Sequence, residues 1–146
     1  MNFLPEQIKK ELIGIYSAIK DGNETCFHEC KSACCKNTFK ISFAEYALIA
    51  EFLKENHGFS FIEEILARNN DDCVFLSPEK KCDVYDARPY VCRIYKNKNY
   101  GCCSDFDVES AMQIVNLNQK LDIGLFKFYE GAMRFWLLNF PLSEKR

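Results

Sequence analysis

The sequence predicts a mainly α protein, a compact helical domain of about five helices with a small cysteine-bearing hairpin and loops. Apolar residues recur at helical spacing in several segments, and polar or glycine-containing stretches separate these segments. The chain has 146 residues, of which 48% are apolar and 14% aromatic. It is therefore long enough to bury a core, and we expect one domain over residues 1–146.

Two segments near the N-terminus are expected to form helices, over residues 5–20 and 42–57. The apolar residues of the first recur every three or four positions: Ile8, Leu12, Ile15 and Ile19. In the second, Ser42 and Glu45 form a capping-box pattern, in which each side chain accepts the other's backbone N–H. Gly58 follows as a left-handed terminator of this helix.

Shorter signals predict two further helices. Ser60 and Glu63 repeat the capping-box pattern before a third helix over residues 61–69. A fourth helix is expected over residues 107–119, where Asp107 and neighbouring acidic residues favour the positive N-terminal end.

Residues 122–140 are expected to form a fifth helix that is apolar on nearly all sides. Its charges, Lys127, Glu130 and Arg134, fall three and four residues apart and would share one narrow stripe. These charges disfavour a membrane span. The segment is predicted to be the central core helix of the C-terminal helices (107–140), and the alternative is an interface with a protein partner or a homodimer.

The remaining distinctive feature is cysteine content. Nine cysteines lie within the core of the sequence motif, residues 26–103: Cys26, Cys30, Cys34, Cys35, Cys73, Cys82, Cys92, Cys102 and Cys103. The first ten residues lack the features of a secretory signal, which predicts a cytoplasmic protein with reduced thiols. Clustered cysteines in a reducing compartment favour metal binding, because thiolates are soft donors for zinc, iron and iron–sulfur clusters.

Spacing constrains how these thiols could act. Cys26, Cys30 and Cys34 fall on one stripe of a regular helix, whereas Cys35 would point away, so the segment is either a loop or serves two sites. Residues 73–85 are expected to form a hairpin around a Ser-Pro turn, with Cys73 and Cys82 side by side near its open end. The spacing differs from that of zinc ribbons and ferredoxins.

The cysteine pattern resembles a known family. The resemblance lies in three parts of the sequence: the quartet Cys26, Cys30, Cys34 and Cys35, the segment Cys73-x-Phe-Leu, and the segment Cys82-x-Val-Tyr-x-x-Arg-Pro-x-x-Cys92-Arg. Together they resemble the YkgJ-type cysteine-cluster proteins, a zinc- or iron-chelating domain related to one in flagellin lysine methylases. The family has two residues between its first two cysteines, whereas this chain has three between Cys26 and Cys30.

The resemblance implies that the seven cysteines from Cys26 to Cys92 are metal ligands. Cys102 and Cys103 lie beyond the best-matching part, and one of them could supply an eighth ligand, which would give two sets of four with one cysteine to spare. The resemblance also implies that Arg88 and Arg93 are not ligands but brace the Cys92 loop and orient its sulfur. The expected function is chelation of zinc or iron, the latter also as an iron–sulfur cluster. No catalytic residue is predicted.

Two other functions remain open from the sequence. One is a protein-modifying enzyme related to lysine N-methylases, although no cofactor loop is visible and a stand-alone enzyme is not expected. The other is a thiol redox protein, disfavoured because adjacent cysteines form strained pairs. The formal net charge of −2 predicts neither a nucleic-acid partner nor a membrane partner, which leaves the metal ion as the expected partner.

Overall fold

A computed structural model describes residues 4–19, 41–68, 73–79, 81–94, 107–121 and 130–131. These residues contain five α-helices, a short 3-10 helix and two short strands, which confirms the mainly α prediction. The helices are α1 (Glu6–Ala18), α2 (Phe43–Asn56), α3 (Phe59–Ala67), the 3-10 helix η3 (Tyr85–Ala87), α4 (Tyr90–Ile94) and α5 (Val108–Gln119). No helix within these ranges has both the length and the apolar character needed to cross a bilayer.

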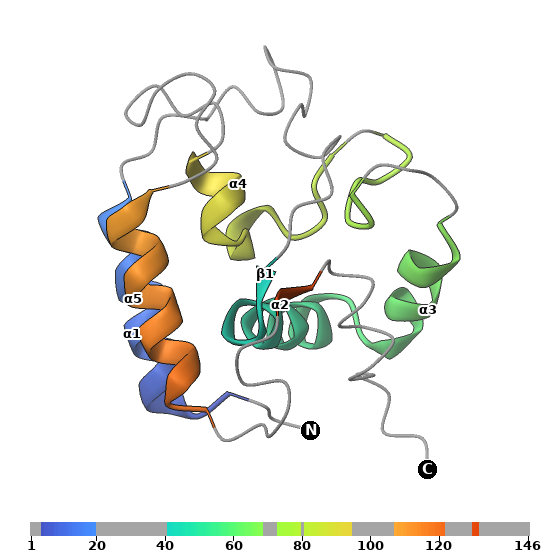
Figure 1. Cartoon of the computed structure of the whole chain (residues 1–146). Coiled ribbons are helices and arrows are strands. Elements are labelled where there is room, and N and C mark those ends of the chain that lie inside the picture. The colour runs from blue at the N-terminus through green and yellow to red at the C-terminus, as the bar shows by residue number, and fades with distance from the viewer. Residues whose placement is uncertain are drawn as a thin grey trace.

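Helix α2 is the centre of the described core. Every residue from Phe43 to Ala50 is buried, because α1, α3, α5 and η3 all contact this helix (Figure 1). Periodicity in the sequence alone does not show how many neighbours surround a helix, so this degree of burial is a finding of the structure. Ser42 caps the helix, and its hydroxyl accepts the backbone N–H of Glu45, as expected from the capping-box pattern.

Helices α1 and α5 lie side by side along one flank of α2 (Figure 1). Of the predicted apolar stripe of α1, Ile8 and Leu12 are buried, and Ile15 and Ile19 are partly buried against the same core. Tyr16, which is not part of the predicted stripe, is buried as well. Helix α5 begins at the expected place, because the Asp107 side chain accepts the Ser110 N–H at 3.1 Å.

The junction between α2 and α3 differs from the prediction. Gly58 has φ 78° and ψ 177°, a conformation that ends α2, and Gly58 is also the N-cap of α3. Helix α3 therefore begins at Phe59, with no side-chain cap. The capping box predicted from Ser60 and Glu63 is wrong, because the sharp turn at Gly58 starts the helix before Ser60 can cap it.

A single helix over residues 122–140 is also wrong. Glu130 and Gly131 form strand β2 (Glu130–Gly131), which pairs antiparallel with β1 (Ile41–Ser42) directly before α2. Gly131 lies opposite Ile41, and Glu130 lies opposite Ser42. The rest of the predicted helix, and with it the proposed interface for a partner, lies outside the described residues.

Two glycines provide a test of this backbone. We expect Gly58→Ala to lower the free energy of unfolding by about 1–3 kcal/mol, because its φ and ψ are almost confined to glycine. Gly14, in the interior of α1 with open space around it, is the matched control. Gly14→Ala should raise the stability by about 0.5–1 kcal/mol. Urea unfolding measures both, and a neutral Gly58→Ala variant would contradict this backbone geometry.

Candidate metal centre

Three of the nine predicted ligands lie within the described residues. Cys73, Cys82 and Cys92 are each half-buried and pack against the edge of the hydrophobic core. The other six lie outside the described residues: Cys26, Cys30, Cys34, Cys35, Cys102 and Cys103. Among the residues that the structure describes, no group of three Cys, His, Asp or Glu side chains could by itself hold a metal ion. A complete site therefore needs donors beyond these three.

Cys73 and Cys82 lie on a compact turn (the 73–83 turn), of which the structure describes residues 73–79 and 81–83. Among these residues, an antiparallel bridge joins Leu76 to Cys82, and the Asp83 N–H donates to the Phe75 carbonyl at 2.9 Å. The predicted hairpin is thus confirmed, but it is shorter than expected. The expected register is wrong, because Cys82 lies opposite Leu76 and not opposite Cys73. The chain bends at Cys73, whose carbonyl accepts the Leu76 N–H at 3.0 Å.

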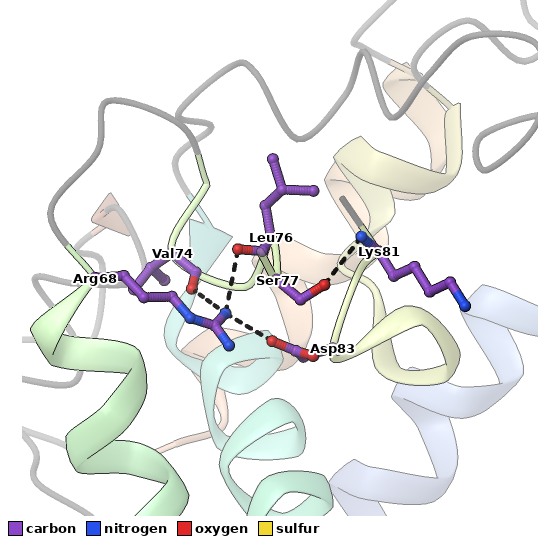
Figure 2. A network of polar contacts seen from close by, with 6 residues as sticks. All are labelled: Arg68, Val74, Leu76, Ser77, Lys81 and Asp83. Carbon is purple, nitrogen blue, oxygen red and sulfur yellow. Dashed lines mark hydrogen bonds and ion pairs between the residues drawn. The ribbon is translucent and has the colours of Figure 1, made fainter. Parts of the chain in front are cut away.

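Arg68, the residue that ends α3, holds this turn together (Figure 2). Its Nη1 donates to the carbonyls of Val74 and Leu76 at 3.0 and 3.3 Å, and to Asp83 Oδ2 at 2.6 Å. The side chains of Arg68 and Asp83 are only 10% and 17% exposed, so solvent screens this ion pair weakly. One guanidinium therefore fixes both limbs of the segment that carries Cys73 and Cys82.

Cys92 lies in α4, and two arginines brace its surroundings. Arg88 Nε donates to the Tyr85 carbonyl at 2.8 Å, and the Arg88 guanidinium lies 3.8 Å from the centre of the Tyr85 ring. Arg93 Nε donates to the Arg88 carbonyl at 2.8 Å, and its Nη2 donates to the Asp86 carbonyl at 3.1 Å. The predicted bracing role of both arginines is confirmed, whereas orientation of the sulfur stays a prediction.

A buried carboxylate lies beside the same loop. Glu45 is 0% exposed, and its Oε2 accepts the Tyr16 hydroxyl at 2.7 Å and the Tyr90 backbone N–H at 2.6 Å. Its Oε1 accepts the Ser42 hydroxyl at 3.1 Å. Burial raises the pKa of Glu45, and the hydrogen bonds from Tyr90, Tyr16 and Ser42 oppose that rise.

Tyr16 and Arg93 extend this cluster. The Arg93 guanidinium lies 4.2 Å from the centre of the Tyr16 ring. Burial, reinforced by the Glu45 carboxylate, raises the pKa of Tyr16 well above its usual range. The phenol therefore stays protonated and donates a hydrogen bond to Glu45. Burial also lowers the pKa of Arg93 from its ordinary value.

The sequence does not indicate the roles of Arg68 and Tyr16 or this use of Glu45. Arg68 carries no signal beyond its place at the end of a predicted helix. Glu45 is predicted only as a capping residue, and the one hint of a further role is that it lies in an otherwise apolar stretch between Phe43 and Ile49.

The donor set fits a soft metal. The three described thiols lie at the margin of the core, where thiolates can reach an ion that is partly shielded from water. Cysteine sulfur suits zinc and iron, and neutral imidazole or carboxylate ligands are not required for either.

Comparison with known families agrees with this chemistry. Residues 25–120 match a family model named CxxCxxCC and described as a "putative zinc- or iron-chelating domain". The match covers well over half of the chain and contains all nine cysteines, so the chain belongs to this family. The family name shows two residues between successive cysteines, whereas three lie between Cys26 and Cys30 and again between Cys30 and Cys34. No curated protein and no solved structure matches the chain.

Removal of the Arg68 guanidinium tests how the 73–83 turn is held. We expect Arg68→Met to lower the free energy of unfolding by about 2–3 kcal/mol, because it leaves Asp83 and two carbonyls without this donor. The control is Lys120→Met, which removes the exposed ion pair between Lys120 and Glu11 and should cost less than about 1 kcal/mol. Equal effects in denaturant unfolding would contradict the role of Arg68.

The buried phenol of Tyr16 predicts a pH dependence. Above the ordinary tyrosine pKa of 10.0, the unfolded chain loses this proton while the folded chain keeps it. The free energy of unfolding should then fall as pH rises above that value. Tyr16→Phe lacks the phenol, so its stability should fall less steeply, and urea unfolding of both proteins from about pH 8 to about pH 11 measures the difference. Parallel profiles would contradict the raised pKa.

Proposed function

We propose that this protein binds zinc or iron through thiolates contributed by both halves of its cysteine motif. The ligands are Cys73, Cys82 and Cys92 together with the quartet Cys26, Cys30, Cys34 and Cys35 and one of Cys102 and Cys103. The family supports metal chelation in general, and the choice of these ligands is our proposal.

The observation that carries the proposal is the bracing of the described thiols. Arg68 fixes the turn that bears Cys73 and Cys82, and Arg88 and Arg93 fix the loop that leads to Cys92. Each arginine donates to backbone carbonyls, so its contacts constrain the path of the chain. Donors that are held in place before the ion binds raise the affinity of a metal site, because less of the binding free energy is then lost in ordering them.

The two metals would serve different purposes. Zinc bound by four thiolates is fully coordinated and would stabilise the fold. An iron–sulfur cluster would in addition accept and donate an electron. In either case metal binding would join segments that are far apart in sequence, and the one-domain prediction over residues 1–146 is part of this proposal.

Cysteine substitutions test the ligand assignment. We expect Cys82→Ser and Cys92→Ser each to lower the metal-to-protein ratio and the melting temperature together, because the free energy of metal binding contributes to folding. Elemental analysis of reduced, anaerobically prepared protein gives the first quantity, and calorimetry gives the second.

Gly58→Ala is the matched control, because it should destabilise the fold without removing a sulfur. It should retain its metal while its melting temperature falls. Full metal occupancy with unchanged melting in both cysteine variants would exclude Cys82 and Cys92 from the site.

A further inference from the structure

Helix α4 is too short to position Cys92 by itself. It has five residues, Tyr90–Ile94, and isolated helices of this length are unstable in water because nucleation is costly. Contacts from the rest of the molecule must therefore fix where Cys92 lies. Two contacts serve this purpose at opposite ends of the helix, the hydrogen bond at Tyr90 and the bracing of Arg93.

The contact at Tyr90 comes from a side chain distant in sequence. Glu45 Oε2 accepts the Tyr90 N–H at 2.6 Å, and this N–H belongs to the first residue of α4, where no carbonyl of the same helix can accept it. Capping of α2 does not require this oxygen, because the Ser42 hydroxyl caps α2 and the Glu45 Oε1 accepts from Ser42.

Complete burial of a carboxylate is costly unless every oxygen is well hydrogen-bonded. A glutamate at the start of α2 would ordinarily be exposed, yet Glu45 is 0% exposed and lies between α1 and α4. Tyr16 supplies the second donor to the same oxygen at 2.7 Å. The Tyr16 ring also lies under the Arg93 guanidinium, so Tyr16 is linked to both ends of α4.

We infer that Glu45, held by Tyr16, is a positioning residue that presents the Cys92 thiolate to the metal. This inference rests on the proposed function, since it concerns the same site. The carboxylate is not a ligand: it acts through the backbone of α4 and sets the place of Cys92 relative to the core. Groups that orient ligands from outside the coordination sphere commonly control metal affinity.

Three variants of the full chain separate positioning from general stability. Glu45→Leu removes the acceptor for the Tyr90 N–H, whereas Glu45→Gln keeps a carbonyl oxygen that can accept it. Asn118→Leu is the matched control, because buried Asn118 accepts the Ala44 backbone N–H at 2.9 Å and thus binds the start of α2 and not α4. Both leucine variants lose a buried acceptor for a helix N–H. Only Glu45→Leu loses an acceptor for an N–H of α4, the helix that contains Cys92.

The readouts are the affinity of the metal-free, reduced protein for Zn²⁺ and the thiolate charge-transfer band after Co²⁺ loading. Glu45→Leu should lower the Zn²⁺ affinity by about ten- to a hundredfold and change the Co²⁺ band. Glu45→Gln should restore both toward wild type. Asn118→Leu should melt at a lower temperature while keeping the wild-type affinity and spectrum. Wild-type affinity and spectrum in a folded Glu45→Leu protein would overturn the inference.

A second readout does not depend on metal. In the metal-free protein, alkylation of individual cysteines followed by mass spectrometry reports how firmly Cys92 is held, with Cys73 as the internal reference. Glu45→Leu should raise the alkylation rate of Cys92 relative to Cys73, and Asn118→Leu should not. If wild-type protein binds no metal, the proposed function fails, and an unchanged Cys92 rate in Glu45→Leu separately overturns the positioning role. If Glu45→Leu does not fold, Tyr16→Phe replaces it and should raise the Cys92 rate in the same direction.

Discussion

The buried carboxylate of Glu45 joins three parts of the chain that are far apart in sequence. Through one oxygen it binds Tyr16 of α1, 29 residues earlier, and Tyr90 of α4, 45 residues later. The carboxylate itself belongs to α2, the most deeply buried described helix. A charged or strongly polar group at this depth must keep all its partners, so the relative positions of α1, α2 and α4 are tightly constrained.

The polar contacts around the cysteines follow one pattern. Arg68, Arg88 and Arg93 all donate to backbone carbonyls of the segments that carry cysteine, and Glu45 accepts a backbone N–H from such a segment. These contacts act on the backbone, so they fix the path of the chain on either side of each described cysteine. The described part of the cysteine motif, which carries Cys73, Cys82 and Cys92, is thus mostly short turns and loops that buried charged side chains hold against a helical core.

Much of the helical framework could be predicted from sequence. Helix α1 follows from its apolar stripe, α5 from the acidic cap at Asp107, and α2 from Ser42, because these signals are local and act within one helix. The predicted start of α3, at residue 61, is two residues too far along the chain, because the turn at Gly58 begins the helix at Phe59 and not after a cap at Ser60.

Parts that depend on distant residues could not be predicted in this way. Nothing in the local sequence shows that Tyr16 and Tyr90 meet on Glu45, or that Arg68 reaches Asp83 across the turn. The register that places Cys82 opposite Leu76 depends on the bend at Cys73, which alternation of residue types does not encode. The cysteine motif nevertheless identified the family, because its residue types and spacing are specific.

The most direct test of this account is elemental analysis of the full chain, purified under anaerobic, reducing conditions and combined with its visible absorption spectrum. We predict stoichiometric zinc in a colourless protein, or iron in a brown one, because zinc has no d-electron transitions and iron–sulfur clusters absorb visible light. Protein that is folded and reduced but contains neither zinc nor iron would contradict the central claim that its cysteines form a metal site.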